Sequence, residues 1–124
     1  MEIYCQECTN IFTGKSYIRL LRHGYFYNND SLLSMAEKYF GNKKLSDTSK
    51  DFLIQAAVLE PDEEGNNLIV FNKAKYPDLY VKDVVVASCS APFYFPPYKI
   101  ENKEYVDGGV FANDPTFVCF TYFA

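Results

Sequence analysis

Apolar side chains recur at helical spacing over residues 30–40, which is the clearest periodic pattern in the chain. Asp30 is suited to cap the start of a helix, and Gly41 supplies a stop at its end. The pattern therefore predicts an amphipathic helix here. Upstream, the apolar run at residues 17–21 predicts one or two helical turns. The periodic positions are Leu32, Leu33, Ala36, Tyr39 and Phe40.

Two apolar runs flank a segment dense in turn-forming and charged residues. The first run, residues 52–59, is apolar apart from one residue and suits a strand covered on both faces. Residues 60–67 follow as the turn, and residues 68–71 are again apolar. This arrangement predicts a β-hairpin.

The segment 79–88 fits two structures. Val84, Val85 and Val86 favour a strand because they are β-branched, yet Val81, Val84, Val85 and Ser88 also fit one helical face. Propensity alone predicts a strand.

Prolines interrupt regular structure in the aromatic stretch that follows, residues 92–98. A hairpin turn is predicted at residues 101–103, followed by a short strand at residues 104–106. At the end of the chain, Asp114 and Pro115 predict the start of an apolar helix. That helix has no C-cap before Ala124, so we expect a chain cut at an arbitrary point.

The composition sets limits on class and partners. The chain has 124 residues, of which 48% are hydrophobic and 18% aromatic, enough for the core of one domain. Its net charge of -4, without clustered basic residues, argues against nucleic acid as a partner. No run reaches the roughly 18 apolar residues of a transmembrane helix, and no export signal is visible at the N-terminus. A cytoplasmic protein, peripheral to membranes where it meets lipid, is expected.

The cysteines and the single histidine carry weak chemical signals. Cys5 and Cys8 have a spacing found in metal and redox sites, but no second pair completes a zinc site, so structural thiols are favoured over a peripheral redox pair. His23 is interpreted as a surface or loop residue. Ser16 follows Gly14 and Lys15, but Thr9 stands where a phosphate-binding loop needs glycine.

Residues 106–115 form the one cluster with a chemical character. Asp107 ends the predicted strand 104–106, and Gly108 and Gly109 allow the backbone to approach a neighbour closely. A carboxylate placed in this way can be aimed into a cleft at the end of a sheet. The alternative is a simple turn in which Asp107 binds its own loop backbone. The cluster by itself does not decide between the two.

Two motifs taken together resemble a known family. Residues 88–97 read SCSAPFYFPP, and residues 107–115 read DGGVFANDP. This ordered pair closely resembles the distal half of the patatin-like phospholipases, in which an Asp-Gly-Gly motif ends in Asn-Asn-Pro. One departure is Asp114 in place of the second Asn, a change that keeps the ability to cap a helix.

The resemblance implies a fold, a chemistry and a set of partners. The fold is α/β, a partial three-layer α/β/α patatin-like fold truncated at both ends, so that residues 1–124 form an incomplete domain. A serine and an aspartate act as a dyad without histidine, and Asp107 takes the carboxylate role within the motif Asp107, Gly108 and Gly109. The substrate is a lipid or phospholipid at a membrane surface. No metal and no organic cofactor are implied. The family also has a helix at residues 79–88, against the propensity.

The family's nucleophile motif, Gly-x-Ser-x-Gly, is missing, as is the glycine-rich loop that supplies oxyanion donors. The expected function is therefore that of a fragment of a lipid acyl hydrolase, inactive in isolation. An alternative is a non-catalytic module that associates with a chain carrying the serine half. None of the seven serines has glycine at both second-neighbour positions: Ser16, Ser31, Ser34, Ser46, Ser49, Ser88 and Ser90.

Overall fold

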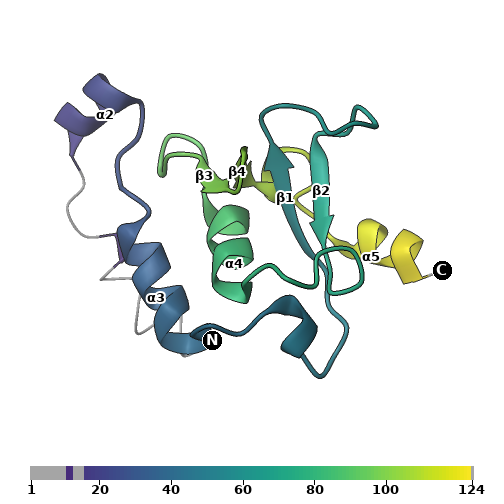
Figure 1. Ribbon diagram of the computed structural model, residues 1–124. Coiled ribbons are helices and arrows are strands. Elements are labelled where there is room, and N and C mark those ends of the chain that lie inside the picture. The colour runs from purple at the N-terminus through teal and green to yellow at the C-terminus, as the bar shows by residue number, and fades with distance from the viewer. Residues whose placement is uncertain (1–10, 13–15, 124) are drawn as a thin grey trace.

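A computed structural model describes residues 11, 12 and 16–123, and Figure 1 shows the arrangement of its helices and strands. The α-helices are α2 (Tyr17–His23), α3 (Asp30–Phe40), α4 (Val81–Cys89) and α5 (Thr116–Phe123). The strands are β1 (Ile54–Val58), β2 (Leu68–Phe71), β3 (Tyr98–Ile100) and β4 (Lys103–Asp107). The described residues also include two single-turn 3-10 helices, η1 (Leu45–Asp47) and η2 (Gly108–Val110).

The four strands form one antiparallel sheet in the order β2-β1-β4-β3. Both predicted hairpins are confirmed, since β1 pairs with β2 and β3 pairs with β4. The two hairpins join through β1 and β4, with Ala56 opposite Asp107. Together with the helices the sheet gives a mixed α/β fold, which confirms the expected class and is compatible with part of a patatin-like fold.

Helix α4 corrects the strand that propensity alone predicts for residues 79–88, and it agrees with the helix that the family resemblance implied. Val81 and Val84 pack into the core cluster beneath the sheet, whereas Val86 belongs to a second cluster shared with α3. Helix α4 thus lies between the sheet and α3, as Figure 1 shows. Burial on two sides outweighs the modest cost of β-branched residues in a helix.

Helix α3 ends as predicted at Gly41, whose φ of 54° is a conformation that favours glycine. It begins at Asp30, with Asn29 rather than Asp30 in the cap position. The Asn29 amide donates to the Pro96 carbonyl at 3.0 Å, which ties the helix to the aromatic loop. Helix α2 also confirms the helical turns predicted from residue 17.

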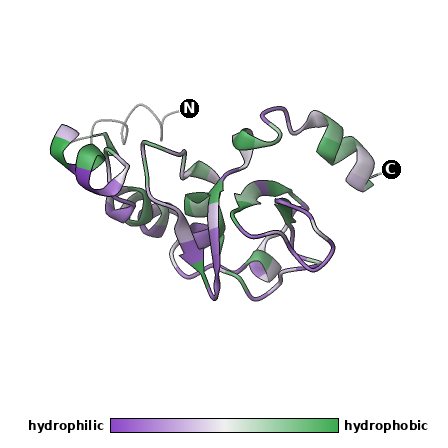
Figure 2. Ribbon diagram, turned by 90° about the horizontal axis from the view of Figure 1, so that it is seen from above, coloured by the Kyte–Doolittle hydropathy of each residue, from purple (hydrophilic) through white to green (hydrophobic). Residues whose placement is uncertain are grey.

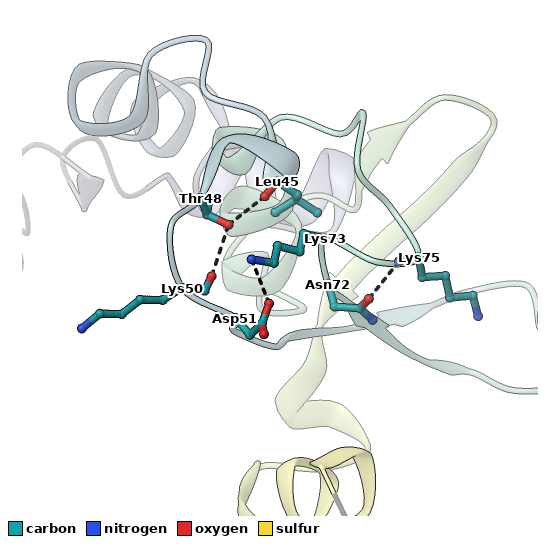
Figure 3. A network of polar contacts seen from close by, with 7 residues as sticks. All are labelled: Leu45, Thr48, Lys50, Asp51, Asn72, Lys73 and Lys75. Carbon is teal, nitrogen blue, oxygen red and sulfur yellow. Dashed lines mark hydrogen bonds and ion pairs between the residues drawn. The ribbon is translucent and has the colours of Figure 1, made fainter.

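The loops at the edge of the sheet where β1 begins and β2 ends are fixed by polar contacts (Figure 3). Lys73 forms an ion pair with Asp51 at 2.9 Å. Asn72 is buried, and its side-chain oxygen accepts a hydrogen bond from the Lys75 N–H. The Thr48 hydroxyl donates to the carbonyl of Leu45 at 2.7 Å. Because β1 and β4 are antiparallel, this edge is also where β4 ends.

Helix α5 follows the predicted start signal, since the Asp114 carboxylate accepts a hydrogen bond from the Thr116 N–H at 2.9 Å. Figure 2 shows this helix as largely hydrophobic and at one end of the molecule, and its last residues, Tyr122 and Phe123, line a pocket with residues 51–52 and 72–74. Phe117 and Phe120 are 74% and 72% exposed. In the part of the chain that is described, no helix has the length and apolar character needed to span a membrane.

The Tyr98 hydroxyl links β3 to α4 through a hydrogen bond to the Asp83 carboxylate at 2.7 Å. Burial, and then this carboxylate, raises the pKa of Tyr98. We expect Tyr98→Phe to lower the free energy of unfolding by about 1 kcal/mol at pH 7. Because the folded-state pKa is the higher one, this contribution is fully present below the ordinary tyrosine pKa of about 10 and declines as the pH rises from there toward the folded-state value.

Urea unfolding of both proteins from pH 7 to 11 measures this difference. Tyr94→Phe is the matched control, because the Tyr94 side chain is half exposed and none of the described residues bonds its hydroxyl. A difference between wild type and Tyr98→Phe that stayed constant above pH 10 would contradict the assigned role of the hydroxyl.

Candidate active site

Asp107 occupies the last position of β4, as the sequence predicted. Its side chain is half-buried, and its Oδ1 accepts a hydrogen bond from the Gly109 N–H at 2.8 Å. No described residue forms an ion pair with it or bonds its Oδ2. The local turn weighed as an alternative is thus present, and it leaves one carboxylate oxygen available to a further donor.

The two glycines after Asp107 are needed for close approach. A Cβ on Gly108 would lie 2.7 Å from the Gln55 carbonyl oxygen, closer than real Cβ contacts allow. A Cβ on Gly109 would lie 3.2 Å from Asp107 Oδ1 and 3.1 Å from Asn113 Oδ1. The first glycine lets β4 and η2 lie against β1, and the second lets the carboxylate fold over its own turn.

The end of α4 anchors the strand that carries Asp107. The Asp107 N–H donates to the Ser90 carbonyl at 3.0 Å. The Ser90 hydroxyl is fully buried and donates to Val86 of α4, while the Ser88 hydroxyl donates to the Gln55 carbonyl at 2.7 Å. The two halves of the sequence motif therefore meet in space, and residues 88–90 hold Asp107 from one side.

Cys89 lies close enough to Asp107 for their charges to interact. Burial of its thiol, and secondly the negative charge of Asp107, raises the pKa of Cys89, although part of the residue is exposed to solvent. We predict that Asp107→Asn shifts the pH profile of Cys89 alkylation by iodoacetamide to lower pH. The measurement uses a background in which Cys5, Cys8 and Cys119 are serine. An unchanged profile would show that the two groups do not interact.

An apolar cleft of about 440 Å³ lies beside this site. Val106, Val110 and Phe111 line one part of it, directly before and after the Asp-Gly-Gly turn. The aromatic loop lines another part, through residues that include Phe93 and Phe95. Its size falls within the range of small-molecule sites. Asp107 itself is not among the lining residues.

The aromatic loop is held firmly against the segment before α3. The Phe93 carbonyl accepts from the Phe26 N–H at 2.9 Å, and the Tyr94 carbonyl accepts from the Tyr27 N–H at 2.7 Å. Phe93 has a φ of 68°, which is rare for an aromatic residue, and its side chain is 71% exposed. These bonds fix the backbone of the loop that carries Phe93, an exposed residue in the lining of the cleft.

The weaker sequence signals have separate outcomes. Ser16 caps α2 by accepting a hydrogen bond from the Arg19 N–H at 3.2 Å. His23 is exposed at the end of α2 and stacks on Tyr25, which agrees with a surface histidine. Cys5 and Cys8 lie outside the described residues.

The family model described as patatin-like phospholipase matches residues 7–120, which is most of the chain. The chain belongs to the patatin-like phospholipase family. Asp107 and the turn that holds it thus lie within the part of the chain that matches the family model.

Two plant proteins of Arabidopsis thaliana are similar to this patatin-like chain. Patatin-like protein 4 is 31% identical, over 77% of this chain and 25% of its own length. Patatin-like protein 1 is 25% identical, over 95% of this chain and 33% of its own length. The chain therefore spans between a quarter and a third of the length of these relatives.

Two features of the patatin-like site were missed from the sequence. The first is the cleft, whose walls come from segments far apart along the chain. The second is Gln55, whose side-chain amide donates to the Ala112 carbonyl. The sequence could have indicated Gln55, because it is the single polar residue in the apolar run 52–59.

Proposed function

We propose that this chain is the aspartate-bearing part of a serine acyl hydrolase that cleaves acyl ester bonds of membrane lipids. Residues 1–124 then form an incomplete patatin-like domain, and a longer protein supplies the serine. The observation that carries the proposal is a half-buried Asp107 at the end of β4, held by Gly109 with one carboxylate oxygen unbound, inside the family's paired motifs.

In this mechanism Asp107 accepts the proton of the serine hydroxyl as that oxygen attacks the acyl carbonyl. The protonated Asp107 then gives this proton to the alcohol oxygen of the lipid as the bond between that oxygen and the acyl carbon breaks, and an acyl-serine remains. Water then attacks the acyl-enzyme with Asp107 again acting as base, which releases the fatty acid. The dyad proposed here is made of protein side chains and draws on no metal or organic cofactor.

We assign the acyl chain of the substrate to the apolar cleft. Its walls are mostly aliphatic and aromatic, with His23 and Asn67 as polar lining residues, and Val110 and Phe111 continue directly from the turn that holds Asp107. Phe93, an exposed residue in its lining, has the aromatic character of side chains that lie at the interface between water and lipid. This placement suits an enzyme that works at membrane surfaces.

The test is made on a chain that contains these residues together with a Gly-x-Ser-x-Gly segment encoded upstream. Hydrolysis of a p-nitrophenyl ester and of phospholipid vesicles is compared with that of the isolated 124 residues, for which we expect no turnover. Turnover by the isolated chain, or an unrelated upstream domain, would overturn the proposal.

A second candidate is a non-catalytic module that associates with a chain carrying the serine half. The exposed aromatic face of α5 favours it, since Phe117 and Phe120 are apolar side chains left largely in water. Mixing the 124-residue chain with a serine-bearing chain and measuring the mass of the product by light scattering distinguishes the two candidates. Recovery of a stable complex without esterase activity supports the module.

A further inference from the structure

Gln55 contacts the turn that carries Asp107 with both its backbone and its side chain. Its carbonyl and its Cγ lie where a Cβ on Gly108 would be, so β1 and the turn are in direct contact. Its amide Nε2 donates to the Ala112 carbonyl, 57 positions along the chain. Gln55 therefore touches the first residue after Asp107 and also a residue near the end of the same loop.

The loop between these two contacts is short and already closed on itself. The N–H groups of Phe111 and Ala112 both donate to the Gly108 carbonyl, at 3.2 and 3.0 Å. With Ala112 fixed by Gln55, movement of the loop away from β1 would require this side-chain bond to break. The loop shape in turn sets the position of the Gly109 N–H, which holds Asp107 Oδ1.

The residues at the end of α4 hold Gln55 from the other side. Its backbone carbonyl accepts the Ser88 hydroxyl at 2.7 Å, and that bond does not depend on the side chain at position 55. The side-chain oxygen of Gln55 is buried and accepts no hydrogen bond within the described part of the chain. The amide thus contributes one directed bond, and that bond goes to the loop of Asp107.

We infer that Gln55 is a positioning residue that holds the Asp107 carboxylate in the orientation needed to accept the serine proton. The inference rests on the proposed function, because it gives Gln55 an effect only through Asp107. A misplacement of about 1 Å in a reacting group can cost on the order of 100-fold in rate. A side-chain bond that restrains the loop is therefore expected to matter more to kcat than to substrate binding.

The experiment uses the longer chain that carries the serine segment, with Gln55→Met as the main variant. Methionine has nearly the same length and packs in the same space, but it cannot donate to the Ala112 carbonyl. We expect kcat for a p-nitrophenyl ester to fall about tenfold or more, with KM within about twofold of wild type. The number of reactive serines is measured by labelling to completion with a fluorophosphonate. The value of kcat is then calculated per labelled serine.

The matched control is Thr48→Val, which removes a side-chain bond to a backbone carbonyl in the loop before β1 without touching residues 107–113. We expect it to change the unfolding midpoint but not kcat per labelled serine. If the activity lost in Gln55→Met is fully explained by a lower number of labelled serines, Gln55 is merely structural and the inference is overturned.

Asp107→Asn separates this inference from the function on which it rests. If Asp107→Asn is inactive while Gln55→Met turns over at the wild-type rate, the positioning role fails and the dyad stands. Wild-type rates in Asp107→Asn remove the dyad itself. In the double variant we expect no loss beyond that of Asp107→Asn, because the two residues act as a unit. A further tenfold loss would show that Gln55 acts by another route.

Discussion

Replacing Asp107 with asparagine in the serine-bearing chain is expected to lower kcat for ester hydrolysis by about 100- to 10,000-fold, the range for loss of a general base. Asparagine has the shape of aspartate and can still accept the Gly109 N–H, which is 2.8 Å from the carboxylate. The turn should therefore keep its geometry. What is lost is the basicity that receives the serine proton, so KM should change little.

Initial rates with a p-nitrophenyl ester, measured over a range of substrate concentrations, give kcat and KM separately. The control is Asp114→Asn, which restores the family's second Asn and keeps a side chain able to cap α5. It should retain wild-type activity. Equal rates in wild type and Asp107→Asn would remove Asp107 from the catalytic role and leave it as a turn residue.

The sequence predicted most elements because their signals are local. Gly41 stops α3, residues 60–67 separate β1 from β2, and residues 101–103 turn between β3 and β4. Each signal depends on a few adjacent residues whose backbone preferences agree with the final fold. Segment 79–88 differs because its four valines have contacts on two sides, with the sheet and with α3, that no local pattern contains.

The candidate site likewise has features that a local sequence pattern predicts and features that depend on contacts between distant segments. Asp107 could be found because its motif is contiguous, and its turn could be anticipated from the glycines that follow it. The contact between Gln55 and Ala112 could not, since it joins a strand to a loop 57 positions away. The apolar cleft likewise depends on the aromatic loop and on residues 106–111 folding together. A polar residue in an otherwise apolar strand indicates a hydrogen-bond partner elsewhere in the chain, because buried polar side chains are usually paired.

Replacing Gly108 with alanine is expected to lower the free energy of unfolding by about 1–3 kcal/mol, the usual cost of forcing extra atoms into a packed site. The added Cβ would lie 2.7 Å from the Gln55 carbonyl oxygen and 2.8 Å from its carbonyl carbon. Both are backbone atoms of β1, so neither can turn aside as a side chain would. The clash can be relieved only if β1 and η2 move apart, beside the position where Ala56 pairs with Asp107.

Gly109→Ala is the matched comparison, because the nearest atoms to its Cβ would all be side-chain atoms, with the oxygen of Asn113 at 3.1 Å and that of Asp107 at 3.2 Å. Side chains can give by a few tenths of an ångström, so we expect a smaller loss of stability from Gly109→Ala but a clear loss of kcat as the carboxylate is displaced. Urea unfolding and ester hydrolysis on both variants test this contrast.

Gln55→Ala should not rescue Gly108→Ala, since it removes the nearby Cγ and leaves the backbone carbonyl in place. An unfolding midpoint for Gly108→Ala equal to that of wild type would mean that β1 and the turn of Asp107 are not in the close contact on which the site depends.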